Sequence, residues 1–191
     1  MTDARRLSQA ISEGDGISVI VRVDDLDQAR AAEAQGAEGI ALQSPIEGLT
    51  GATSLPVLWL GDPDAREAQA SCNAHAVIAW AKDDRLHDIH ARLADDTELV
   101  AGVANDEHLE RALELDTHVF LLSAEEADGD QHEIDRVIEL LPDVPAGKLA
   151  IAEVDAVSRE EVLALERAGF DAVLVPPGDV AELVGGLPPE V

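Results

Sequence analysis

Several side chains that could serve acid–base chemistry or ligand binding come at the ends of short apolar segments. Glu153 lies in the apolar run 148–154, and a carboxyl group buried there would have a raised pKa suited to proton transfer. Lys82, one of only two lysines, and Arg22 are cations in comparable places. A bond to a neighbouring strand would account equally for Glu153, and pairing with Asp83 would account for Lys82.

Other polar residues occupy similar places and complete the set of candidates. They are Asp24, Gln43, Ser44, Asp62, Trp80, Asn105, Asp106, Ser123, Glu125 and Asp155. Asp24, Asp62 and Asn105 are also expected as helix caps, and Trp80 as packing. Asp62, Glu153 and Asp155 could hold Mg²⁺, although such groups arise by chance in an acidic chain. We therefore expect no cofactor and assign no metal ligand, with Mg²⁺ as the alternative.

Histidine and cysteine give no further site. The single cysteine, Cys72, excludes an intramolecular disulfide framework and cysteine-based zinc sites. His75 and His118 come at the starts of apolar segments, where we expect structural roles. His87 and His90 lack a convincing third ligand, and we interpret them as surface residues.

The charge excludes two classes of partner. The chain has 13 basic and 40 acidic residues and a formal charge of −27, which repels nucleic acid and anionic membranes. A hydrophobic content of 46% with clear periodicity argues against disorder. We interpret the acidity as that of a halophile, in which carboxylates hold hydration and multimolar salt screens their repulsion. Without a long apolar run or a signal-peptide core, a cytoplasmic protein is expected.

The segment 147–175 contains the clearest structural unit. Two apolar runs, 148–154 and 172–175, flank a segment with apolar residues at helical spacing. Ser158 and Glu161 form the pattern of a capping box, and Gly169 is placed to end the helix. A strand–helix–strand unit of this length predicts a right-handed parallel crossover.

The whole chain can be divided into such units. Strands are expected at 17–23, 38–42, 56–60, 76–80, 99–103, 118–122, 148–154 and 172–175. Helices are expected at 2–12, 25–34, 63–72, 85–94, 106–115, 133–141, 159–168 and 178–184, with Asp62 and Asn105 as caps of two of them. Residues 43–54 are too irregular for a full helix.

A repeat in alternate units favours a closed (β/α)8 TIM barrel. Residues 36–40, 73–77, 115–119 and 169–173 each join a helix end to an even-numbered strand. An open doubly wound sheet is the alternative, but no glycine-rich nucleotide turn is present. We predict a single domain over 1–191, with a helical lead-in at 1–16, the barrel at 17–184 and a tail at 185–191.

From Ser54 onward, the chain resembles indole-3-glycerol phosphate synthase, a tryptophan-pathway barrel. The resemblance lies in 54–58, 105–113, 132–135, 151–153 and 167–175. The family's N-terminal extension and its loop after the second strand are much shorter here. The resemblance implies a (β/α)8 barrel with its site at the carboxyl ends of the strands.

Most positions of the family's mechanism carry unsuitable residues. By alignment, the strand-three lysine falls on Leu60, the strand-one lysine and glutamate fall on Val19 and Val21, and the strand-five glutamate falls on Gly102. The strand-six asparagine falls on Leu122 or Ser123, and on strand seven only Glu153 remains. The phosphate turn has become 176–178, in which two prolines remove N–H donors.

Two functions therefore remain. The first is a barrel that has lost catalysis and serves as a binding or assembly protein with a protein partner. The second is an active carbon–carbon lyase of the resembled type. In that enzyme Glu153 and Lys82 would be catalytic, and Arg22, Ser123 and Gly178 would bind a small phosphorylated or carboxylated metabolite. The oligomeric state is not predicted.

Overall fold

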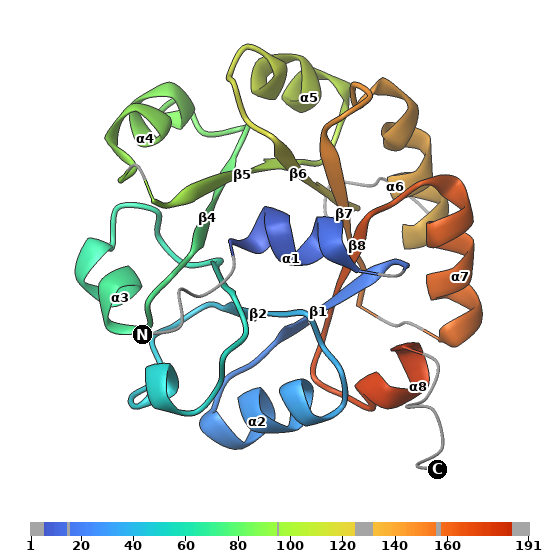
Figure 1. Cartoon of the computed structure of the whole chain (residues 1–191). Helices are drawn as coiled ribbons and strands as arrows, with labels where there is room; N and C mark the ends of the chain where they lie inside the picture. The colour runs from blue at the N-terminus through green and yellow to red at the C-terminus, as the bar shows by residue number, and fades with distance from the viewer. Residues whose placement is uncertain (1–5, 15, 95, 125–131, 156–157, 185–191) are drawn as a thin grey trace.

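The computed structural model of the chain describes residues 6–14, 16–94, 96–124, 132–155 and 158–184. Eight parallel strands pair in chain order and close into a barrel, with helices around its outside (Figure 1). β1 pairs with β8, with Ser18 opposite Ala172, so the sheet has no open edge. The predicted (β/α)8 barrel is confirmed. The candidate Glu125 and the tail 185–191 lie outside the described residues.

The elements follow the predicted order with small changes at their ends. The strands are β1 Ser18–Arg22, β2 Gly39–Leu42, β3 Val57–Trp59, β4 Ala76–Trp80, β5 Glu98–Val103, β6 Val119–Ser123, β7 Leu149–Glu153 and β8 Ala172–Val175. The α-helices are α1 Leu7–Glu13, α2 Leu26–Ala34, α3 Arg66–Ser71, α4 Leu86–Arg92, α5 Asp106–Leu113, α6 Glu133–Leu140, α7 Arg159–Ala168 and α8 Val180–Val184. The 3₁₀ helices are η1 Leu49–Gly51 and η2 Leu141–Asp143.

Local capping fixes where several helices begin and end. The side chains of Asp25 and Asn105 accept hydrogen bonds from the first turns of α2 and α5. Ser158 and Glu161 form the predicted capping box of α7, and Gly169 ends that helix at a φ of 109°. Each cap satisfies backbone groups that the helix leaves unpaired. The predicted caps at Asn105, Ser158 and Gly169 are confirmed, whereas α2 is capped by Asp25 and not by Asp24, whose N–H instead donates to the Gln28 side chain.

The predicted cap at Asp62 is wrong. α3 begins at Arg66, and the Asp62 carboxylate instead accepts a hydrogen bond of 2.9 Å from the N–H of Asp64. The side chain thus stabilises a turn between β3 and α3, because a short acceptor can bond the backbone two residues ahead as well as cap a helix.

The strands separate two hydrophobic clusters. The barrel interior holds Ile20, Ala41, Leu58, Ala76, Ile78, Val100, Val119, Leu121, Ile151, Ala172 and Leu174. The alternate side chains pack outward against the helices. Val19 and Val21 belong to this outer layer, whereas Ile20 faces inward. The placement of the strand-one catalytic pair on Val19 and Val21 is therefore wrong by one residue.

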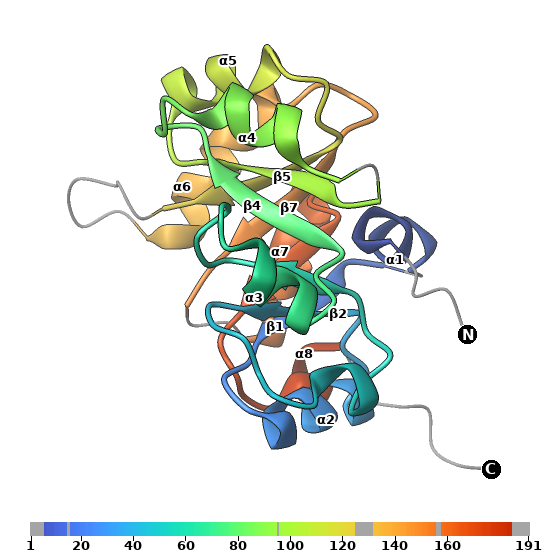
Figure 2. The same ribbon diagram turned by 90° about the vertical axis from the view of Figure 1, so that its left-hand side faces the viewer.

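α1 covers the end of the barrel at which the strands begin (Figures 1 and 2). Leu7 and Ile11 of this helix are buried in the interior cluster. The N–H of Ser8 donates to the Glu98 carboxylate at 2.9 Å, and its hydroxyl also donates to Glu98. This carboxylate at the start of β5 thus fixes the first turn of α1 over the barrel.

Candidate functional site at the carboxyl end of the barrel

Three predicted site residues converge at the carboxyl ends of the strands. Arg22 ends β1, Ser123 ends β6, and Glu153 ends β7 directly opposite Ser123. The guanidinium of Arg22 donates to the Glu153 carboxylate and, at 3.0 Å, to Asp155. Strand alternation produces this arrangement, because Arg22 follows Ile20 on the inward side of β1. The structure thus places these three predicted residues at one barrel mouth.

Glu153 has an unusual environment for a carboxylate. Its side chain is 13% exposed, and its Oε2 atom is buried without a hydrogen-bond partner. Ser123 beside it is buried as well. A buried acceptor without a partner costs free energy, so such an atom in a folded protein calls for an explanation. The arrangement can pair charges and can accept one more hydrogen bond.

Apolar side chains also lie at the mouth. Leu60 and Trp80 pack against the interior cluster, as predicted for Trp80. A Cβ atom at Gly102 would lie only 2.6 Å from the Trp80 ring, so that ring occupies the space of a strand-five side chain. Lys82 follows β4, with its ammonium 5.5 Å from the centre of the Trp80 ring. The ammonium group of Lys82 thus lies over this indole.

The turn after β8 uses its backbone donors internally. Gly178 is exposed and follows two prolines. The N–H of Val180 donates to Oε1 of Gln35 at 2.7 Å, and the N–H of Glu182 donates to the Asp179 side chain at 3.3 Å. Helix N-termini bind phosphate through such N–H groups. Here side chains of the chain itself accept from two of them.

No group of three or more His, Cys, Asp or Glu side chains is arranged to hold a metal within the described ranges. The suggested Mg²⁺ ligands do not form such a group, since the Asp155 carboxylate pairs with Arg22 and the Asp62 carboxylate accepts from the N–H of Asp64 within its own turn. Arg22 and the two carboxylates bonded to it are thus arranged as an ion-pair cluster. Among the helices of the described segments, none is long and apolar enough to span a membrane.

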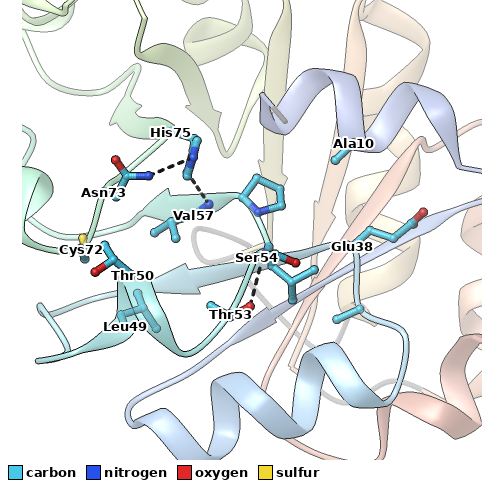
Figure 3. Close-up of a pocket in the computed structure, with 13 residues that line it drawn as sticks. Ala10, Glu38, Leu49, Thr50, Thr53, Ser54, Val57, Cys72, Asn73 and His75 are labelled. Carbon is cyan, nitrogen blue, oxygen red and sulfur yellow. Dashed lines mark hydrogen bonds between the residues drawn. The ribbon is translucent and has the colours of Figure 1, made fainter. Parts of the chain in front are cut away.

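Five cavities lie among the described residues, and none of these five is lined by Arg22, Ser123 or Glu153. The largest, about 680 Å³, lies where strands β2, β3 and β4 begin, beside α1 and η1 (Figure 3). The sequence did not predict it. Its one signal was the irregular segment 43–54, in which a helix of the outer ring is reduced to η1.

His75 forms one wall of this cavity and is held as a neutral ring. Its Nδ1 accepts a hydrogen bond of 3.1 Å from the N–H of Val57, and Nε2 lies 3.2 Å from the Asn73 amide (Figure 3). Burial lowers the pKa of His75, although the charges of Glu98 and Asp96 oppose this shift. The predicted structural role agrees with these bonds.

This lowered pKa should make stability depend on pH. Because the folded chain resists protonation of His75, the unfolded chain binds the proton first as pH falls through about 6.5. The free energy of unfolding should therefore decrease below that pH. His75→Gln should flatten the decrease in urea unfolding measured at several pH values, whereas His87→Gln on the surface of α4 should not. Equal profiles for both variants would contradict this role for His75.

The fold and the mouth define a TIM barrel, a class in which functional residues gather at the carboxyl ends of the strands. No protein-family model matches the chain. Indole-3-glycerol phosphate synthases from two strains of Acidithiobacillus ferrooxidans are 30% identical over 100 residues, 52% of this chain. The match spans 38% of the length of these relatives. The chain thus has distant sequence similarity to these synthases.

A solved structure, the N-acetylmannosamine-6-phosphate 2-epimerase from Clostridium perfringens, resembles the fold with a TM-score of 0.64. The likeness covers 86% of this chain and 88% of the epimerase at 16% identity. At that identity it supports the barrel architecture alone.

Proposed function

We propose that this TIM barrel does not catalyse the ring closure of indole-3-glycerol phosphate synthase and acts in the cytoplasm by binding a protein partner. The contact between Trp80 and Gly102 carries the proposal. Proton transfer needs a positioned donor and acceptor, and an indole ring fills the place of the strand-five carboxylate. Leu60 likewise provides no proton at the end of β3.

The electrostatics of the mouth also support a barrel without a phosphorylated substrate. Arg22 is already paired with Glu153 and Asp155. The loops that follow the strands add further carboxylates at Asp24, Asp25, Asp62, Asp83, Asp84 and Asp179. A phosphate ester would meet this negative field with few donors to offset it.

The direct test is turnover of the carboxyphenylamino deoxyribulose phosphate substrate, followed by indole fluorescence in multimolar KCl with and without Mg²⁺. We expect no turnover above that of buffer in a sample shown to be folded by circular dichroism. Turnover that Glu153→Gln abolishes would overturn the proposal, because it would identify Glu153 as a proton-transfer group of a working site.

One observation favours the second candidate, an enzyme of the lyase type that acts on a small phosphorylated or carboxylated metabolite, as in tryptophan biosynthesis. The unpartnered Oε2 of Glu153 lies beside Ser123 and the guanidinium of Arg22. A carboxyl oxygen with room for one more hydrogen bond suits a general acid or base. For this candidate, Arg22→Gln and Glu153→Gln should each abolish turnover, whereas Arg30→Gln on α2 should not.

A further inference from the structure

The 680 Å³ cavity has the size of a small-molecule site, which is usually between about 300 and 1,000 Å³. It exists because η1 is a single 3₁₀ turn where the other crossovers carry longer helices. In Figure 3 Asn73 and His75 lie at one end, and Glu38 lies at the other, below Ala10 of α1. The cavity is at the opposite end of the barrel from Arg22 and Glu153.

The charge of the lining selects the kind of ligand. Glu38 is the only one of the 13 lining residues with a formal charge at neutral pH, and none of them is Lys or Arg. Glu38 is half-buried with its carboxylate oxygens beside Gly14, and within the described residues this carboxylate forms neither an ion pair nor a hydrogen bond. Anions would meet one carboxylate and the field of a chain with a charge of −27. A cation would be attracted both by the Glu38 carboxylate and by the negative field of the chain.

Apart from Glu38, the cavity is lined by apolar side chains and by uncharged polar side chains. Leu55, Pro56 and Val57 line the cavity, and in Figure 3 Val57 lies between the two ends. At the end away from Glu38, Thr50 is exposed and Asn73 holds its amide beside His75. Asn73 has a positive φ of 53° because it ends α3 in the left-handed conformation, with the N–H of Ala74 donating to the carbonyl of Gln69 at 2.9 Å.

We propose that this cavity binds a small organic cation of the amino-alcohol class. Its ammonium group pairs with Glu38, its short apolar body lies on Leu55 and Val57, and its hydroxyl group bonds Thr50 or Asn73. Each group of the ligand then meets a lining group of matching chemistry. The inference concerns a site separate from the barrel mouth, and it does not rest on the proposed function.

The test is a titration of the full-length protein with three probes of similar size: 4-amino-1-butanol, n-butylamine and 1-butanol. Binding is followed by the amide NMR shifts of residues 50–57 and 73–75, at the lowest KCl concentration that keeps the protein folded. We expect 4-amino-1-butanol to bind most tightly and 1-butanol most weakly. The shifts should saturate and should be confined to the cavity.

Two matched variants separate the cavity carboxylate from the general negative field. Glu38→Gln should weaken binding of 4-amino-1-butanol by at least about tenfold and leave 1-butanol unchanged. Glu47→Gln removes the same charge from an exposed position in the connection between β2 and β3, outside the cavity, and should change neither affinity. Native amide spectra of both variants establish that they are folded.

Three results would overturn the proposal. Equal effects of the two variants would mean that only the overall charge attracts the amine. If 1-butanol bound as tightly as 4-amino-1-butanol, Glu38 would have no role in binding. Shifts spread over the acidic surface would mean adventitious binding. All three results leave the turnover experiment on the barrel mouth unaffected, so the two proposals fail separately.

Discussion

Raising KCl from about 0.1 M to about 3 M should raise the melting temperature of this protein by on the order of 10 °C, equivalent to roughly 3–5 kcal/mol. The cause is the formal charge of −27, because repulsion among the carboxylates destabilises the compact state. Salt shortens the range of this repulsion from about 10 Å at 0.1 M to about 3 Å at 1 M. A melting temperature that did not rise would refute our interpretation of the acidity as halophilic.

A control must separate screening from the general strengthening of apolar burial by salt. Near pH 4.2, the isoelectric point calculated from the sequence, the net charge approaches zero and little repulsion is left to screen. The slope of melting temperature against KCl should therefore be much smaller there than at pH 7. An equal slope at both pH values would assign the salt effect to apolar burial.

Arg22→Leu should lower the free energy of unfolding by up to about 3 kcal/mol. The change removes the cation that faces Glu153, whose side chain is 13% exposed and whose Oε2 already lacks a partner. Removing one member of a fully buried pair costs about 3–5 kcal/mol. The cost here lies at the lower end, because the Arg22 side chain is 32% exposed. Urea unfolding measures it.

The double variant Arg22→Leu/Glu153→Leu separates the cost of leaving a buried charge without its partner from the cost of lost side-chain packing. It should recover most of the stability, because no charge is then left buried without a partner. Arg30→Leu is the matched control, since its pair with Asp27 at 3.4 Å is largely exposed and should be worth under about 1 kcal/mol. If Arg22→Leu cost no more than Arg30→Leu, the cluster at the mouth would have no structural role.

The fold was predictable because its signals are local and repeated. Ser158, Glu161 and Gly169 specify the start and end of α7 within one short segment, and similar units recur along the chain. The direction in which β1 side chains point was predicted wrongly. Ser18 and Arg22 are the two polar residues of this strand and share the inward face with Ile20, whereas the alignment placed Val19 on that face.

The site was predictable only in part, for a related reason. Arg22, Ser123 and Glu153 could be grouped because parallel strands bring their carboxyl ends together. The indole of Trp80 lies over Gly102 of the next strand, a contact between side chain and backbone that no spacing indicates. The cavity at Glu38 depends on the absence of a packed helix, which the irregular segment 43–54 indicated without showing its result.

The pairing of β1 with β8 also determines when the protein can become folded during synthesis. Ser18 of β1 cannot pair with Ala172 until β8 has been synthesised. Ser8 of α1 likewise bonds Glu98, which is 90 residues further along the chain. Contacts between distant parts of a chain slow folding, because the intervening segment must first be ordered. A nascent chain that ends before β8 therefore has two open strand edges, which can pair with another chain. Release of the last strand from the ribosome is the event that ends this exposure to aggregation.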